Sequence, residues 1–149
     1  MSSADPDDPL HRFRAAQDRD GVYARALAEL RRGRKDTHWM WFVFPQLAGL
    51  GRSVTAREFA IGSLQEARDY VRDPVLGARL RECAGALGEH RDTPARTILG
   101  DIDAIKLRSS MTLFARAADD PAPFEAVLAQ FFAGAADPRT LELLAAGPG

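Results

Sequence analysis

The chain has 149 residues, of which 46% are hydrophobic and 28% charged, and its 20 basic residues nearly balance 21 acidic ones. This length fits one domain with its own core, and the near-neutral charge excludes strong electrostatic attraction to nucleic acid or to an anionic membrane. The longest apolar run, residues 39–45, is too short to cross a bilayer. The single cysteine, Cys83, excludes an internal disulfide. We therefore expect a cytoplasmic protein.

Helix-start signals recur along the whole chain. Aspartate or threonine stands before proline, as an N-cap before the first helical turn does, at Asp8, Asp73, Thr93, Asp120 and Asp137. No Asn-Gly hairpin turn and no long alternating strand pattern occurs. The predicted helices span residues 9–18, 21–32, 38–44, 54–61, 64–72, 74–88, 94–99, 102–118, 121–133 and 138–146.

These elements predict an all-α fold, a compact single-domain bundle of about eight to ten short helices around a central buried helix at about 102–118. We expect a flexible N-terminus at residues 1–8, a helical domain at 9–146 and a frayed C-terminus at 147–149. The central helix is predicted from apolar residues that leave only a narrow polar side, namely Ile102, Ile105, Leu107, Met111, Leu113 and Phe114.

The segment 37–46 contains both tryptophans and places polar His38 and Gln46 at the ends of a very apolar run. Burying each large side chain stabilises a core by about 1.5–3 kcal/mol. Polar groups beside such a run must find hydrogen-bond partners. The segment therefore predicts either a rigid core or a lined pocket.

Lys35 and Lys106 are the only lysines among the 20 basic residues, which suggests positions where arginine would not serve. Lys106 and Ser110 are four residues apart and share a helix face. Three interpretations are open. Lys106 can form a nucleophilic pair with Ser109 or Ser110. It can line a pocket for a small anion or a nucleotide-like ligand together with these hydroxyls and His38. Finally, it can pair with Asp101 or Asp103 or reach the surface.

Other polar groups carry weaker signals. His38 is either a proton donor or acceptor in a pocket walled by tryptophans or a histidine hydrogen-bonded at a helix terminus. Gln46 either satisfies carbonyls at a helix end or faces a ligand. Segment 49–53 opens a helix beside an arginine, as some phosphate sites do, although a capped turn between helices explains it as well. The three histidines are widely separated, so we expect no metal site and no cofactor.

Several blocks of this sequence are similar to one bacterial family. The blocks are residues 33–35, 38–46, 49–53, 73–77, the single positions Gly100 and Asp103, and residues 106–114 and 137–141. The chain resembles the domain-of-unknown-function family number eighteen-ten, sometimes labelled calpastatin in genomes, over roughly Leu10 to Leu144. The resemblance implies a compact, mainly α-helical single domain, and it implies no established activity, ligand or catalytic residue.

Our leading hypothesis is a pocket between segments 38–46 and 106–112 that binds a small anionic or nucleotide-like ligand. The candidate lining residues are His38, Trp41, Gln46, Lys106, Ser109 and Ser110. The alternative is a protein–protein interaction module without catalysis, in which Trp39, Trp41 and Phe44 form an exposed aromatic patch. A third hypothesis is a hydrolase or transferase with His38 as its base. The sequence leaves open whether the protein is an enzyme and which protein partner, if any, it has.

Overall fold

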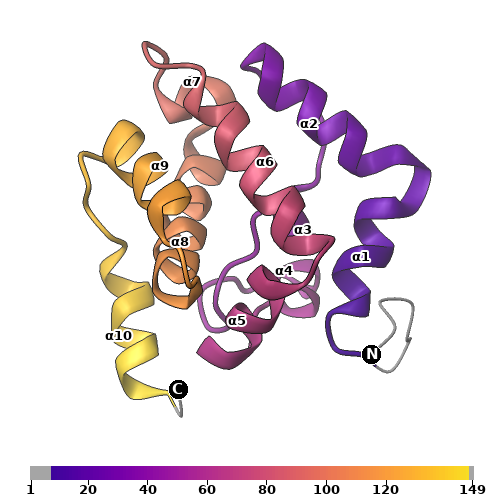
Figure 1. Cartoon of the computed structure of the whole chain (residues 1–149), viewed down its shortest axis with the longest axis vertical. Helices are drawn as coiled ribbons and strands as arrows, with labels where there is room; N and C mark the ends of the chain where they lie inside the picture. The colour runs from indigo at the N-terminus through magenta and orange to yellow at the C-terminus, as the bar shows by residue number, and fades with distance from the viewer. Residues whose placement is uncertain (1–7, 148–149) are drawn as a thin grey trace.

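The computed structural model of the protein describes residues 8–147, and these form a bundle of α-helices (Figure 1). The helices are α1 His11–Asp18, α2 Val22–Arg32, α3 Met40–Val43, α4 Val54–Glu58, α5 Leu64–Arg72, α6 Leu76–Gly88, α7 Ala95–Leu99, α8 Asp101–Ala117, α9 Ala122–Phe132 and α10 Pro138–Ala146, with a 3-10 turn at Arg19–Gly21. Over the same residues, β-pairing is limited to an isolated parallel bridge between Leu47 and Ile61. The predicted all-α fold is confirmed. Except for Asp8 and Gly147, the predicted flexible ends lie outside the described residues.

Side-chain caps fix several helix starts where the sequence predicts them. The Ser63 hydroxyl accepts a hydrogen bond from the Glu66 N–H at the start of α5. The Glu66 carboxylate accepts from the Gly62 N–H, one residue before the position that a capping box uses. Asp137 accepts from the Thr140 N–H at the start of α10. Each cap satisfies an N–H group that the helix itself leaves without a partner.

Three predicted helices, α1, α3 and α6, begin two residues later than their sequence signals suggest, and α1 begins at His11 instead of residue 9. α6 begins at Leu76 because the Asp73 carboxylate accepts hydrogen bonds from the N–H groups of Val75 and Leu76 ahead of the first turn. α3 begins at Met40, and Trp39 before it has a non-helical backbone conformation. For α6, a carboxylate outside the helix sets the start, which periodicity alone does not reveal.

The longest helix, α8, lies in the middle of the bundle and packs against α5, α7, α9 and α10 (Figure 1). Leu107, Met111 and Phe114 are fully buried on it. The prediction was wrong for its first turns, where the side chains of Ile102 and Ile105 are 71% and 65% exposed. Apolar spacing predicts which residues share a face, but it does not say how far a neighbouring helix covers that face.

A continuous series of aromatic rings joins α1, α5, α8 and α9. The Phe13 and Tyr70 ring centroids are 5.1 Å apart, edge to face. Tyr70 lies 5.2 Å from Phe114, which lies 6.0 Å from Phe124. Such pairs contribute about 0.5–1.5 kcal/mol each beyond their buried area. The series connects the first helix, α1, with α9 through α5 and α8.

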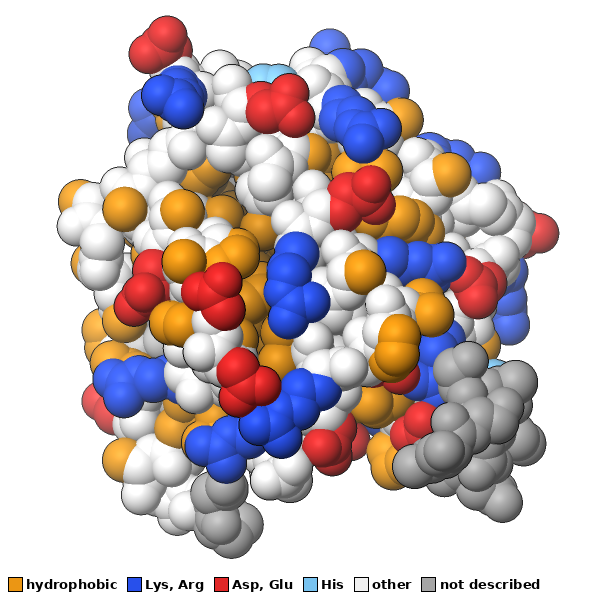
Figure 2. Space-filling view, in the orientation of Figure 1, with side chains coloured by type: hydrophobic (Ala, Val, Ile, Leu, Met, Phe, Trp, Pro, Cys, Tyr) orange, Lys and Arg blue, Asp and Glu red, His pale blue; other side chains and the backbone are white. Residues whose placement is uncertain are grey.

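The surface carries both signs of charge in close alternation, as Figure 2 shows for one face. Exposed ion pairs such as Arg72–Asp119, 3.0 Å apart, join neighbouring elements there. Such exposed pairs contribute little to stability, about 0–1 kcal/mol each. None of the helices within residues 8–147 combines the length and apolarity that crossing a membrane would require.

Candidate functional site

The loop between α2 and α3 is organised by one buried carboxylate, that of Glu29. It accepts hydrogen bonds from the N–H groups of Asp36 and Thr37, from the Thr37 hydroxyl and from the Trp39 indole N–H, at 2.6–3.0 Å. Burial by itself raises the pKa of Glu29, but these hydrogen bonds outweigh it and lower the pKa to about 2. The carboxylate is therefore ionised at neutral pH and fixes the position of residues 36–39.

This loop brings Lys35 against the start of α8. The Lys35 ammonium lies 3.0 Å from a carboxylate oxygen of Asp103, and it stands over the Trp39 ring at 5.1 Å from the centroid. Lys106 Nζ lies 3.7 Å from the other oxygen of the same carboxylate. The two lysines of the chain thus meet at one aspartate, and the cluster carries one positive charge in excess.

Trp41 lies beside this cluster and is only half-buried. Lys106 Nζ is 5.7 Å from the centroid of the Trp41 ring, and the exposed imidazole of His38 is 6.5 Å from it, centroid to centroid. The ammonium and the imidazole therefore both flank one indole ring. An ammonium over a ring is attracted by the negative potential of the ring face.

A small cavity lies next to Lys106. Its lining consists of Met40, Trp41, Phe44, Gln46, Leu47, Gly51, Ala56, Phe59, Ala60 and Lys106. Its volume is about 10 Å³, which is room for a single water molecule. Of the six candidate residues from the sequence, Trp41, Gln46 and Lys106 line this cavity.

The two candidate serines lie elsewhere on α8. The Ser109 hydroxyl donates to the Ile105 carbonyl at 3.3 Å, the usual bond of a serine inside a helix. Ser110 is fully buried, and its hydroxyl has no hydrogen-bond partner among the described residues. Neither serine lines the cavity beside Lys106. The geometry therefore gives no support to a Ser–Lys nucleophilic pair.

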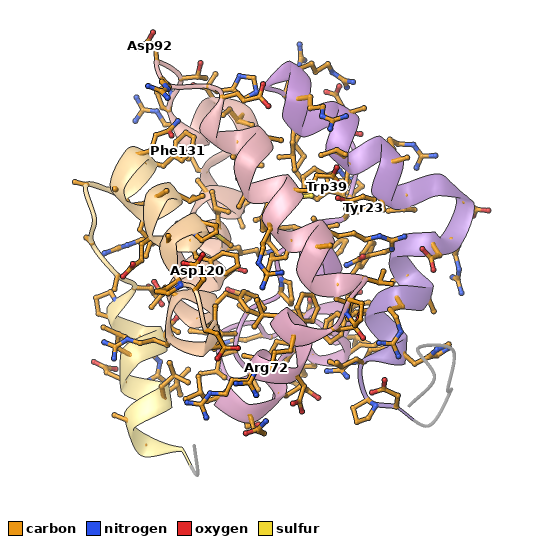
Figure 3. All side chains as sticks on the ribbon, in the orientation of Figure 1. Tyr23, Trp39, Arg72, Asp92, Asp120 and Phe131 are labelled. Carbon is orange, nitrogen blue, oxygen red and sulfur yellow. The ribbon has the colours of Figure 1, made fainter. Side chains whose placement is uncertain are left out.

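The predicted aromatic patch is wrong. Trp39 is completely buried and Phe44 is 1% exposed, so of the three aromatics only Trp41 reaches the surface. Figure 3 shows Trp39 in the interior, in the region of α2 and α6. The reason is the Glu29 carboxylate, which draws the Trp39 indole N–H inward. The sequence pattern did not reveal this partner.

Cys83 is a core residue. Its side chain is completely buried, and burial raises the pKa of its thiol to about 12. Over residues 8–147 no three histidine, cysteine, aspartate or glutamate side chains stand together as metal ligands would.

Two residues important to the site were missed as site residues by sequence reasoning. Glu29 sits inside a helix among arginines such as Arg25 and Arg32, which suggest an ordinary surface ion pair, and nothing local marks it as the acceptor for residues 36–39. Asp103 was considered only as one possible partner of Lys106. The signal that could have found the cluster was the scarcity of lysine, because Lys35 and Lys106 do meet in space.

The fold and these groups define an all-α, single-domain protein with a lysine cluster at the start of its central helix. The chain belongs to the family described as "Protein of unknown function (DUF1810)", whose model matches residues 7–144. The crystal structure of the conserved hypothetical protein Rv1873 from Mycobacterium tuberculosis is similar over 96% of this chain and 100% of that one, with 49% identity and a TM-score of 0.90. Among curated proteins none matches the chain.

Proposed function

We propose that the protein binds a small anionic ligand between segments 38–46 and 106–112, with Lys106 as the group that holds the anion. The observation that carries this proposal is the sharing of one carboxylate by two lysines. Lys35 is the closer partner of Asp103, and its side chain is only 8% exposed. Lys106 is farther from Asp103, and its side chain is 26% exposed. The positive charge of Lys106 is therefore only partly neutralised, and an incoming anion can reach it.

The surrounding groups add selectivity to this charge. Gln46 offers a carboxamide that both donates and accepts hydrogen bonds. The Trp41 ring offers a flat apolar surface beside the ammonium, suited to a planar or nucleotide-like group. His38, exposed next to Trp41, adds a second cation when it is protonated.

Thermal unfolding, followed by tryptophan fluorescence, tests this proposal. We expect inorganic phosphate, AMP or phenyl phosphate, added one at a time, to raise the melting temperature of the wild-type protein. At a ligand concentration of 100 times Kd, the expected gain is about 2.7 kcal/mol. The Lys106→Met variant should lose this gain, because it removes the charge and keeps an apolar stem of similar size.

Arg139→Gln is the matched control, since Arg139 is an exposed cation on α10 paired with Glu142. It should respond to the same anions as the wild-type protein does. Stabilisation that is equal in Lys106→Met and Arg139→Gln would show general ion effects and contradict the proposal. The absence of stabilisation by any of the three anions in the wild-type protein would contradict it too.

A further inference from the structure

The segment 48–60 leaves the bundle and returns to it at the same place. The Ala48 N–H donates to the Ile61 carbonyl at 2.8 Å, and the Ile61 N–H donates to the Gln46 carbonyl at 2.9 Å. These two hydrogen bonds join the ends of a loop that contains the short helix α4. A compact loop with closed ends is an Ω-loop, a type of loop that frequently carries function.

The returning part of this loop is firmly attached to the body. The Phe59 ring centroid lies 5.3 Å from that of Phe42 and 5.9 Å from that of Phe13. The Arg12 guanidinium donates to the carbonyls of Glu58 and Ala60, at 2.9 and 2.8 Å. Residues 58–60 therefore form a fixed base.

The outer part, residues 51–57, is held much less. No residue of α4 is buried, and Val54 is 85% exposed. Within residues 8–147, the hydrogen bonds made by segment 51–57 have both partners inside the loop 48–60. One of them is the helix cap, in which the Ser53 hydroxyl accepts from the Ala56 N–H. Gly49 precedes this part with φ +102°, a conformation that favours glycine. These are the features of a segment that opens at low free-energy cost.

This loosely held segment covers the cavity beside Lys106. Gly51 and Ala56 form one wall of the cavity, and Met40 and Phe44 belong to the wall on the body. With about 10 Å³ of space, the closed cavity admits no ligand larger than water. Moving residues 51–57 outward would uncover a mostly apolar surface with the Lys106 ammonium at its edge.

We propose that residues 51–57 are a lid that opens about Gly49 to admit the apolar body of an anionic ligand, whose charge Lys106 holds. The ligand half of this inference rests on the function proposed above, whereas the lid half stands without it. The class of ligand is an aromatic or aliphatic phosphate ester or carboxylate. Inorganic phosphate would leave the apolar wall exposed to water, at the free-energy cost of unburied apolar area.

The substitution Gly51→Ala tests the lid. The added Cβ would lie 2.5 Å from the Cβ of Ala56, so the closed arrangement must shift, whereas the backbone of Gly51 lies outside the region that favours glycine. We expect trypsin to cut after Arg52 and Arg57 about tenfold faster than in the wild-type protein, and acrylamide to quench Trp41 more strongly. Gly85→Ala, whose Cβ enters open space, is the control and should behave like the wild-type protein. The double variant Gly51→Ala/Ala56→Gly removes the clash and should restore slow cleavage.

Hydrogen exchange of the wild-type protein tests the lid without any substitution. We expect the hydrogen-bonded amides of the segment, those of Ala56 and Arg57, to exchange through an opening that does not depend on denaturant, while the Ala48 and Ile61 amides exchange far more slowly. If residues 51–57 exchange only with global unfolding, the lid is overturned. Unchanged cleavage in a folded Gly51→Ala variant overturns it as well.

Protection from trypsin tests the ligand half. Phenyl phosphate should slow cleavage after Arg52 and Arg57 in the wild-type protein, and inorganic phosphate at the same concentration should slow it much less. Equal protection by the two anions would overturn the apolar-body inference and leave the proposed anion binding standing. Local opening without protection by either anion would keep the lid and overturn the ligand half, whereas the anion-binding function itself would fall only if thermal unfolding also showed no stabilisation.

Discussion

Among single residues, Glu29 has the largest structural role for its size. One carboxylate accepts four hydrogen bonds and thereby fixes the loop that carries Lys35 and the buried Trp39. A charged acceptor of this kind makes stronger hydrogen bonds than a neutral one. The position of the lysine cluster therefore depends on a residue that does not belong to the cluster.

We predict that Glu29→Gln destabilises the protein and flattens its acid denaturation. The pKa of Glu29 falls from 4.5 to about 2 on folding, so its carboxylate adds stability that is present above about pH 5 and lost as the pH falls towards 2. This shift corresponds to about 3 kcal/mol. Urea unfolding at pH 7 and pH 3 would measure it. If the wild-type protein and Glu29→Gln lose the same free energy of unfolding between pH 7 and pH 3, the Glu29 carboxylate does not stabilise the fold in this way.

Cys83 gives a second prediction for a single side chain. Because its thiol is buried and its pKa is raised to about 12, almost none of it is thiolate at pH 8 in the native protein. We expect a thiol reagent such as DTNB to react with Cys83 only as fast as the protein unfolds, and rapidly in 6 M urea. A fast reaction in buffer, at a rate proportional to reagent concentration, would mean that the thiol is accessible.

Among the individual helices, α6 contains three glycines, and two of them, Gly77 and Gly85, lie in opposite environments. A Cβ at Gly77 would overlap the carbonyl of Val71, so this glycine allows α6 to approach the end of α5. A Cβ at Gly85 meets nothing within 4 Å. The same substitution to alanine should therefore have opposite effects at two positions eight residues apart.

We predict that Gly77→Ala lowers the free energy of unfolding by about 1–3 kcal/mol through overpacking. Gly85→Ala should raise it by about 0.4–1 kcal/mol, because alanine restricts the unfolded chain and favours the helix. Urea unfolding of both variants against the wild-type protein checks the pair. Two effects of the same sign would show that the close approach of α5 and α6 does not limit stability.

The helices themselves were largely predictable from the sequence, since local signals determine them. α10 begins at Pro138 after the Asp137 cap and ends at Ala146, as predicted. α4 is shorter than predicted because the chain after Glu58 turns back to pair with Gln46 and Ala48, which are distant in sequence. The loop closure and the lysine cluster both depend on long-range contacts, and periodicity carries no information on these.

In the candidate site, the two segments that the sequence predicts to meet do so at Trp41 and Lys106. The cavity there is smaller than a ligand site. Part of its wall consists of residues that were not among the sequence candidates. Apolar patterning cannot distinguish a wall of a cavity from a wall of the core, because both require buried side chains. Exposure of the first turns of α8 was missed because apolar spacing does not say how far neighbouring helices cover a face.

For the whole molecule, rigidity and accessibility are divided along α8. Its later turns are buried among aromatic rings, whereas its first turns hold Asp103 and Lys106 at the surface, near the loosely held loop. A fixed helix thus presents the charge, and in the proposed lid a weakly attached segment controls access to the apolar wall beside it. This division is common where binding groups must be positioned and still be reached.

The series of rings through Phe114 makes the last prediction, that the bundle unfolds as one unit around α8. Phe114 is fully buried, with Tyr70 and Phe124 on either side. We expect Phe114→Ala to lower the free energy of unfolding by about 3–5 kcal/mol, while Ile105→Ala, at a 65% exposed position of the same helix, changes it by about 0.5 kcal/mol or less. Near-ultraviolet and far-ultraviolet circular dichroism should give coincident urea transitions for the wild-type protein and both variants. Separate transitions, or equal losses in the two variants, would mean that the helices on either side of α8 fold independently of its aromatic core.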